Sequence, residues 1–348
     1  MYNLCHLILI SSIFSLILYP TTSAFARPSL PLLDSVGSSR DRDSQSKYND
    51  EGNGDEEYNE IMSDVKRILV TGANSGIGLA LTKQLVADYG CHVYLGSRDA
   101  IRGASAVDEV KKFSGRDDRV ELLTIDVSSE SSVRAAAASL SHKLGTSGNN
   151  NGNDKLYAIV NNAGTGIAHG SPISVILDTN VRGPRRVVDN FLPLLDPNDG
   201  RIVNVGSGAG PMFVSDILVD PREKSRYVGP MDNNEIEEGI SRVMNLNDDY
   251  AAYAGSKALL ACYTMSLARE HPNLSISILT PGYIKTNMTR GYGATKTPSE
   301  GTVALRKCLF DDLGGMSGYF WGSDGLRSPL HYLRNPGDPE YNGEAPTF

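Results

Sequence analysis

The stretch "KRILVTGANSGIGLA", residues 66–80, passes from a short apolar segment through a glycine-rich turn into a helical pattern. Gly72, Gly76 and Gly78 stand in a G-x-x-x-G-x-G spacing, and the helical pattern begins at Ile77. Glycines let the backbone turn sharply and approach a pyrophosphate, whose charge then lies at the positive end of the new helix. A plain tight turn would use the same glycines. The stretch therefore predicts a strand, a turn and a helix, with a candidate nucleotide site at the turn.

The same alternation of apolar runs with helical patterns continues along the chain. "LALTKQLVADYG" (79–90) and "ASAVDEVKKF" (104–113) have the length of helices and separate apolar runs. Strands separated by helices of ten or more residues predict βαβ units and a parallel sheet. We therefore predict the α/β class, with one domain over residues 65–330 and a C-terminal tail over 331–348. The seven candidate strands occupy residues 66–72, 91–97, 120–127, 156–164, 201–207, 274–282 and 318–323.

Composition argues against several kinds of site. The chain has 348 residues and is 40% hydrophobic, which is ample for a sizeable core. Its formal charge is −8, but residues 1–64 hold ten Asp and Glu against four Lys and Arg, or −6. The remainder, at −2, predicts no nucleic-acid partner. The cysteines lack C-x-x-C and Cys/His spacing, so we expect no metal site and a buried apolar role for Cys91, Cys262 and Cys308.

Residues 1–64 have the pattern of an N-terminal targeting sequence. The apolar run "LILISSIFSLILY", residues 7–19, is 13 residues long, whereas a membrane-spanning helix needs roughly 20. We interpret residues 1–24 as a signal peptide, which leaves no membrane span in the mature chain; an uncleaved anchor is the alternative. Residues 25–64 are nearly free of aliphatic side chains past Val36, so we expect a disordered linker there.

The segment "TSAFARPSL", residues 22–30, resembles the cleavage region of presequences that carry proteins through the endoplasmic reticulum into the complex plastids of algae. The resemblance makes Phe25 the first residue after cleavage and implies the plastid as the destination. Transit peptides of that kind are usually basic, whereas residues 34–60 are acidic. The endoplasmic reticulum lumen or secretion is the alternative destination.

A tyrosine and a lysine stand four positions apart in "YAGSK", at Tyr253 and Lys257. Chance matches to this spacing are expected, and Tyr292 with Lys296 is a second one. Tyr253 lies in a helix-favouring run, residues 251–270, in which positions i and i+4 share a face, whereas Tyr292 lies in a glycine-flanked loop. A nearby ammonium lowers the pKa of a phenol and suits it to proton transfer near neutral pH. The first pair is therefore the candidate and the second a decoy.

Seven short motifs occur in an order that resembles the short-chain dehydrogenases/reductases, over residues 66–323. In "RIVNVGSGAG" the first serine of the family's usual Val-Ser-Ser is replaced by Gly206. The resemblance implies a single Rossmann-type doubly wound domain and an oxidoreductase that uses a nicotinamide dinucleotide. The motifs are "TGANSGIG" from Thr71, Asp126-Val127, "NNAG" at 161–164, "DTNVRG" at 178–183, "VGSGAG" at 205–210, "YAGSK" at 253–257 and "TPGYIKTNM" at 280–288.

The resemblance also assigns roles to single residues. Tyr253 would donate a proton to a carbonyl oxygen, and Lys257 would lower the Tyr253 pKa and bind ribose hydroxyls. Ser207 would hold the carbonyl, and Asn180 would keep a water that relays protons. The candidate cofactor-binding residues are Gly72, Asn74, Ser75, Gly76, Ile77, Gly78, Ser97, Arg98, Asp126, Val127, Asn162, Ala163, Gly164, Tyr253, Lys257, Pro281, Gly282, Ile284 and Thr286.

The end of the second candidate strand distinguishes the two nicotinamide cofactors. Ser97 and Arg98 stand where NAD enzymes of this type carry an aspartate. A carboxylate there would repel a 2′-phosphate, whereas Arg98 can bind that phosphate with two hydrogen bonds. We therefore predict NADP(H). The alternative is that Arg98 is a solvated residue at a strand end.

Ser207 and Tyr253 are 46 residues apart, a longer gap than in many members of the family. Residues 211–248 have the pattern of a helical insertion and resemble the one in monomeric carbonyl reductases, as do "LGSRD", "NFLPLL" and "TPSEGTVALRKC". The resemblance implies a monomer that reduces a small or medium aldehyde or ketone with NADPH. Two alternatives are a plastid reductase of a pigment or lipid intermediate and a non-catalytic NADP-binding redox sensor.

Overall fold

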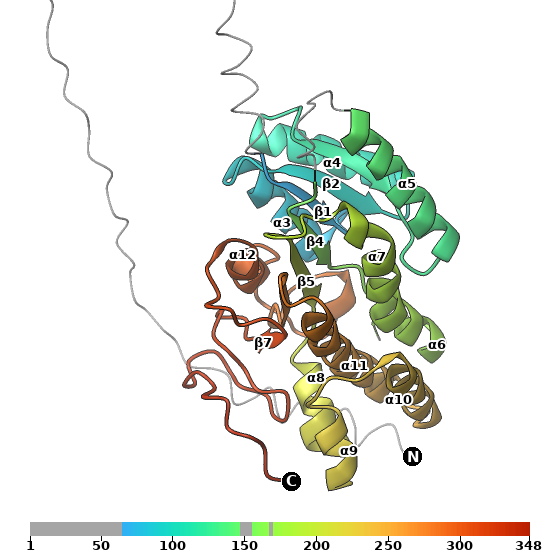
Figure 1. Cartoon of the computed structure of the whole chain (residues 1–348), viewed down its shortest axis with the longest axis vertical. Coiled ribbons are helices and arrows are strands. Elements are labelled where there is room, and N and C mark those ends of the chain that lie inside the picture. Colours follow the sequence, from blue (N-terminus) through green and yellow to red (C-terminus); the bar gives the residue numbers. More distant parts are fainter. Residues whose placement is uncertain (1–64, 147–154, 167–169) are drawn as a thin grey trace, which may run out of the picture. The chain divides into compact units, whose positions relative to one another are not determined.

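The computed structural model describes residues 65–146, 155–166 and 170–348; the expected signal peptide (1–24) and linker (25–64) lie outside them. All seven strands pair in parallel in one sheet of order β3-β2-β1-β4-β5-β6-β7 (Figure 1). This confirms the predicted α/β domain with a seven-stranded parallel sheet. The strands are β1 (Arg67–Val70), β2 (His92–Ser97), β3 (Val120–Thr124), β4 (Ala158–Asn161), β5 (Arg201–Val205), β6 (Ser275–Leu279) and β7 (Tyr319–Trp321).

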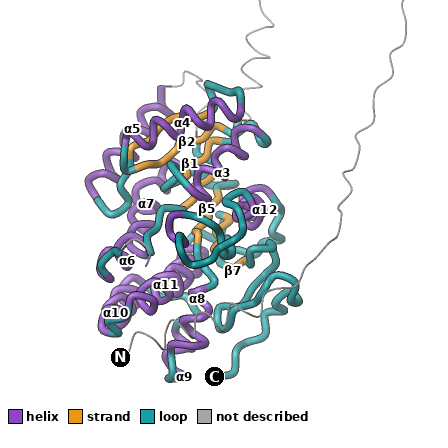
Figure 2. Tube along the Cα trace, turned by 180° about the vertical axis from the view of Figure 1, so that it is seen from behind, coloured by secondary structure: helices purple, strands orange, loops and turns teal. Residues whose placement is uncertain are grey.

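Helices cover both faces of the sheet, which is why its strands are nearly continuous apolar runs (Figure 2). Successive strand residues point to opposite faces, so Ile68 and Val70 belong to one buried cluster and Leu69 to the other. The first cluster contains residues of α3 (Gly76–Ala87), α4 (Ala100–Ser114) and α12 (Val303–Phe310). The second contains residues of α5 (Glu130–Thr146), α7 (Gly183–Phe191) and α11 (Asp249–Glu270).

The strand order reverses beside β1. The chain runs outward from β1 through β2 to β3 and then returns to place β4 on the other side of β1. Crossover loops diverge at such a point, so the carboxyl ends of β1 and β4 border a crevice where ligands bind in open parallel sheets. The candidate motifs after β1 and β4 therefore meet at one edge.

Several short elements complete the domain. Their bounds are α6 (Ile173–Leu177), the π-helix η2 (Asp178–Arg182), η3 (Leu192–Leu194), α8 (Ala209–Met212), the π-helix η4 (Phe213–Ile217), α9 (Pro221–Arg226), α10 (Asn233–Asn245), η5 (Asn287–Thr289) and η6 (Glu300–Thr302).

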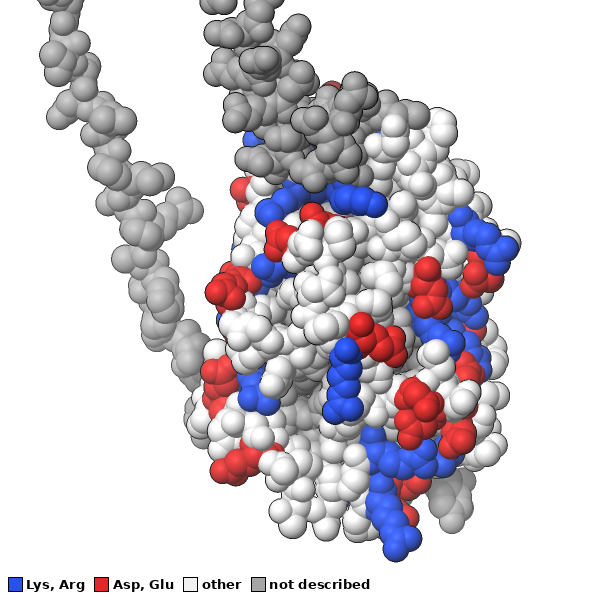
Figure 3. Space-filling model, in the orientation of Figure 1, with Lys and Arg blue, Asp and Glu red and all other residues white. Residues whose placement is uncertain are grey.

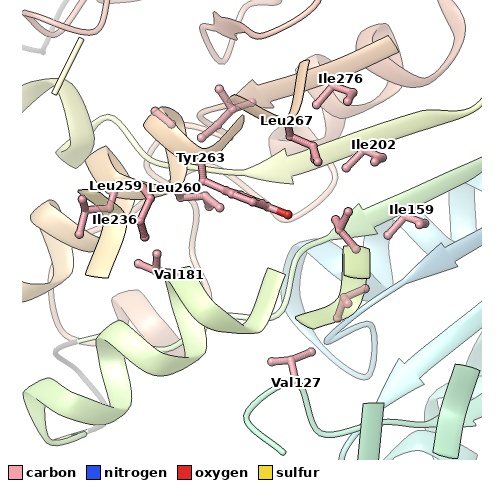
Figure 4. Close-up of a cluster of buried hydrophobic side chains, with 14 of the residues drawn as sticks. Val127, Ile159, Val181, Ile202, Ile236, Leu259, Leu260, Tyr263, Leu267 and Ile276 are labelled. Carbon is pink, nitrogen blue, oxygen red and sulfur yellow. The ribbon is translucent and has the colours of Figure 1, made fainter. Parts of the chain in front are cut away.

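Between β5 and α11 the chain forms α8, η4, α9 and α10, and α10 packs on α11. Asp232 and Glu235 form a capping box that fixes the start of α10. Ile236 of α10 lies beside Leu259 of α11 in the core (Figure 4). A Cβ atom on Gly239 would lie 2.5 Å from Cδ2 of Leu259, so the two helices approach closely at that glycine.

The described residues include no helix long and apolar enough to cross a bilayer, and no cluster of metal-ligating side chains is found among them. Cys91, Cys262 and Cys308 are free and buried, as expected. On the face seen in Figure 3, Lys and Arg side chains are interspersed with Asp and Glu. This mixing agrees with the nearly neutral charge outside residues 1–64.

Candidate active site

The glycine-rich turn after β1 requires its glycines. Gly72 and Gly76 have φ angles of +62° and +57°, in the left-handed region that favours glycine. A Cβ atom on Gly72 would lie 2.8 Å from Cα of Ala163, and one on Gly78 would lie 2.4 Å from Nδ2 of Asn162. The turn after β1 is therefore packed tightly against the residues that follow β4.

Side-chain hydrogen bonds join the same two loops. Asn162 Nδ2 donates to the carbonyl oxygens of Thr71 (2.9 Å) and Gly72 (3.2 Å). Thr71 Oγ1 accepts from the backbone N–H groups of Asn162 and Ala163, both at 3.1 Å. The side chain of Asn162, expected to bind cofactor, thus holds the glycine turn in place. Thr71 contributes equally, although its motif was read for its glycines.

The N-terminus of α3 presents free backbone donors. Ser75 is the N-cap residue, it is exposed, and its side chain makes no capping hydrogen bond. The first N–H groups of a helix lack partners within the helix and carry its positive end, so this terminus fits a pyrophosphate. Asn74 and Ile77, the other candidates here, are partly exposed.

The loop after β6 reaches this turn. A Cβ atom on Gly76 would lie 3.3 Å from Cγ2 of Thr286, and one on Gly301 would lie within 3.4 Å of both Ile284 and Ile77. Gly282 has a φ of +87° and follows the buried Pro281. The structure thus brings the candidate residues of the last motif to the edge that carries the first.

At the end of β2, the side chains of Ser97 and Arg98 differ in exposure and in hydrogen bonding. Ser97 is buried, and its hydroxyl donates to the Asp99 carbonyl oxygen at 2.8 Å, so it shapes the turn. Arg98 is exposed, and its side chain makes no hydrogen bond or ion pair with the rest of the described chain, whereas nearby Arg102 is paired with Asp99. Arg98 is therefore available to a ligand.

The motif after β3 is held by short-range contacts. The Asp126 carboxylate accepts from the backbone N–H (3.0 Å) and the hydroxyl (2.7 Å) of Ser128. Val127 is buried and lies against Gly183, where a Cβ atom would be 3.1 Å from Val127 Cγ2. The contact of Asp126 with a cofactor stays a prediction.

Tyr253 and Ser207 come together although they lie on different elements. Tyr253 is in the first turns of α11, and Ser207 follows β5. Burial raises the pKa of Tyr253, and interaction with the Ser207 side chain partly offsets that effect. The phenol and the hydroxyl can therefore reach the same ligand oxygen.

The expected lowering of the Tyr253 pKa by Lys257 is not found. Lys257 is 7% exposed, and burial lowers its own pKa to about 8. Its Nζ donates to the Val205 carbonyl oxygen at 2.9 Å and lies 6.0 Å from the centre of the Tyr253 ring. The raised pKa comes from burial of Tyr253 itself, which disfavours the phenolate.

Asn180 lies in the π-helix η2, a helix type often found at functional positions. Its Nδ2 donates to the Thr165 carbonyl oxygen (2.9 Å) and to Ser256 Oγ (3.0 Å), and its Oδ1 accepts from Thr165 N–H (2.9 Å). The amide is thus occupied by protein groups. It connects the loop after β4 to the helix that carries Tyr253, and its water-holding role stays a prediction.

Three residues of the site were missed from the sequence. Ser256 is fully buried, and its hydroxyl donates to the Tyr253 carbonyl oxygen at 2.6 Å. A Cβ atom on Gly166 would lie 3.2 Å from Met288 Cγ and 3.4 Å from Tyr253 Cδ2, so both side chains border Gly166. Ser256 and Met288 belong to quoted motifs, but only their contacts show what they do.

The decoy pair lies outside this cluster. Tyr292 is 48% exposed, and only its backbone oxygen accepts a hydrogen bond, from the Tyr283 hydroxyl. Lys296 is exposed. A surface hollow lined by residues of α7 and α11, among them Arg185 and Tyr263, also contains none of the predicted site residues.

The chain is similar in sequence to proteins of known family. The (+)-neomenthol dehydrogenase of Arabidopsis thaliana is 30% identical over 289 residues, which cover 73% of this chain and 94% of that protein. The chain belongs to the short-chain dehydrogenase/reductase family. The model of the short chain dehydrogenase family matches residues 66–217.

Other members of the family agree in sequence and in structure. Carbonyl reductase [NADPH] 3 of Rattus norvegicus is 30% identical over 261 residues, covering 69% of this chain and 89% of that protein. The structure of salutaridine reductase from Papaver somniferum superposes with a TM-score of 0.60 at 25% identity, covering 73% of this chain and 99% of that one. The suspected family membership and the oxidoreductase class are thereby confirmed.

Proposed function

We propose that the protein reduces the carbonyl group of an aldehyde or ketone to an alcohol with NADPH, with Tyr253 as proton donor. The observation that carries this proposal is the interaction of the Ser207 side chain with Tyr253, which lowers the Tyr253 pKa against the effect of burial. It places two hydroxyl groups where both can reach one carbonyl oxygen and stabilise the charge that develops there. NADPH, when bound, supplies the hydride.

The cofactor choice rests on the edge formed by β1, β2 and β4. The positive-φ glycines and the uncapped start of α3 accommodate a pyrophosphate. Arg98 is exposed and unpaired within the described chain, so it can bind a 2′-phosphate with two charge-assisted hydrogen bonds. Relatives named as NADPH-dependent carbonyl reductases support the same choice.

Tyr253 holds a proton at neutral pH, as a proton donor must. Because burial raises its pKa, the phenol keeps its proton at neutral pH and can donate it to an alkoxide forming on the substrate. Ser207 supports the same oxygen. Asn180 and Ser256 hold the first turns of α11, which keeps the Tyr253 ring in position.

The neighbours of the Tyr253 ring favour an apolar substrate. Met288 and the Tyr253 ring both border Gly166, which has no side chain of its own. A thioether is a soft apolar surface that adapts to several shapes. Relatives include (+)-neomenthol dehydrogenase and salutaridine reductase, names that support a small or medium carbonyl compound.

The packing of α10 supports a monomer. Ile236 and Ile240 of α10 are buried against α11 and cover part of that helix. Arg182 ties α10 to η2, because its Nη2 donates to Glu237 Oε2 at 2.6 Å. We propose that this cover replaces the subunit contact that other members of the family make there.

The test compares Tyr253→Phe with the decoy variant Tyr292→Phe. NADPH oxidation is followed by absorbance with a panel of aldehydes and ketones. Tyr253→Phe should lower turnover roughly 10²–10⁴-fold, because it removes the proton donor, and should leave the NADPH dissociation constant nearly unchanged. Tyr292→Phe should behave like the parent. Binding of NADPH without turnover of any carbonyl compound by the parent would point to the redox-sensor alternative.

A further inference from the structure

The chain that follows β7 returns to the loops of the carbonyl site. In both Figures 1 and 2 this stretch lies beside α8, the helix that begins just after Ser207. A Cβ atom on Gly282 would lie 3.1 Å from Cβ of Ser323, and one on Gly208 would lie 2.8 Å from Cδ1 of Leu333. Residues 323–333 therefore contact both the Pro-Gly turn and the residue next to the candidate catalytic serine.

Arg334 anchors this stretch. It is 5% exposed, its Nε donates to Ser328 Oγ at 2.9 Å, and its Nη1 donates to the Asp338 carbonyl oxygen at 2.8 Å. Its guanidinium also forms an ion pair with Asp324. A buried guanidinium with this many partners has one position only, so the neighbouring Leu333 is held in place.

Leu333 occupies the space that a side chain at position 208 would fill. Gly208 has no Cβ, and its N–H donates to Thr280 Oγ1 at 3.0 Å, which fixes the backbone beside Ser207. Leu333 is still 36% exposed, so it is not simply a core residue. An apolar group held against the residue that follows Ser207 can restrict the substituents on a carbonyl carbon bound at Ser207.

We propose that Leu333 is a specificity-determining residue that forms one wall of the carbonyl pocket and limits the size of the substituent beside the carbonyl. The proposal rests on the proposed carbonyl reduction. It adds a residue from outside the family motifs, 126 positions after Ser207 in the sequence.

The experiment uses two ketones that differ only in bulk next to the carbonyl, cyclohexanone and 2-tert-butylcyclohexanone. The ratio of kcat/KM for the bulky ketone to that for the small one is measured with NADPH. Leu333→Ala should raise this ratio roughly tenfold, as expected when a pocket gains a few carbon atoms of space, and Leu333→Phe should lower it. Leu326→Ala is the matched control, because Leu326 is 37% exposed in the same stretch.

A binding measurement separates this proposal from the proposed reaction. Dissociation constants of both ketones are measured by ligand-observed NMR in Tyr253→Phe protein, which should not turn them over, with and without Leu333→Ala. If Leu333→Ala brings the two dissociation constants closer together while the parent turns over neither ketone, the proposed reaction is refuted. The role of Leu333 as a wall of the pocket then still stands. The role of Leu333 would be overturned if Leu333→Ala and Leu326→Ala gave the same ratio of kcat/KM for the two ketones. It would also be overturned if Leu333→Phe did not lower that ratio.

Discussion

Replacing Lys257 with methionine should stabilise the protein and inactivate it at the same time. Burial lowers the pKa of Lys257 from 10.5 to about 8. One pKa unit corresponds to about 1.4 kcal/mol, so holding the charged lysine inside the fold costs about 3 kcal/mol at neutral pH. The hydrogen bond to the Val205 carbonyl oxygen, worth about 1 kcal/mol, is lost in the variant. Lys257→Met should therefore gain about 2 kcal/mol at pH 7.

The size of this stabilisation depends on pH in a defined window. Between pH 8 and 10.5 the unfolded chain keeps the Lys257 proton and the folded chain releases it. Stability of the parent therefore rises with pH across this window, because the unfolded state binds more protons. The advantage of Lys257→Met should shrink over the same range and be mostly gone at pH 10.

Urea unfolding of parent and Lys257→Met at pH 7 and pH 10, without added cofactor, measures both quantities. Lys296→Met is the matched control, because Lys296 is exposed and its removal should change stability little at either pH. NADPH-dependent turnover by Lys257→Met should fall strongly. Two results would refute the view that Lys257 is held as a costly buried charge. One is a Lys257→Met variant that is less stable than the parent at pH 7, and the other is a difference in free energy of unfolding that is the same at both pH values.

Four further outcomes are expected. Arg98→Ala should weaken NADPH binding by about 1.5–3 kcal/mol and leave NADH binding nearly unchanged; equal losses for both would make Arg98 a solvated strand-end residue. Ser256→Ala leaves the buried amide of Asn180 short of one acceptor and should lower the free energy of unfolding in urea by about 1–3 kcal/mol, while an unchanged midpoint would contradict a stabilising role for the Asn180–Ser256 hydrogen bond. Light scattering should give the mass of a monomer, and a tetramer would show that α10 does not cover the contact face. A fusion of residues 1–48 to a fluorescent protein should enter the secretory route and reach the plastid stroma in an alga with complex plastids; cytosolic fluorescence would contradict the predicted targeting function.

Most of the fold was readable from local pattern. A parallel strand covered on both faces is a short apolar run, and a helix long enough to cross the sheet has its own period, so their alternation predicted all seven strands. The glycines of the first turn were also predictable, because a sharp turn after a strand favours glycine, and Gly72 and Gly76 do have positive φ angles. These features depend on a few consecutive residues, and the sequence presents them directly.

The electrostatics of the catalytic pair required the tertiary structure. The spacing of Tyr253 and Lys257 places them on one helical face but says nothing of how deeply each is buried. The structure buries Lys257 and places its Nζ at the Val205 carbonyl oxygen, and burial of Tyr253 itself raises the Tyr253 pKa. Desolvation depends on every element packed around a group, so no local motif reports it.

The sequence by itself determined the order of strands and helices along the chain, the position of the glycine turn and which tyrosine-lysine pair lies on a helix. Only the tertiary structure decided that Ser207 meets Tyr253, that Asn180 is locked by Thr165 and Ser256, and that Leu333 lies on Gly208. Such contacts join residues tens of positions apart, and they exist because parallel strands bring their carboxyl ends, and the loops that follow them, to one edge of the sheet. Hydrophobic period and residue spacing describe neighbours along the chain, whereas loop length and packing select the neighbours in space.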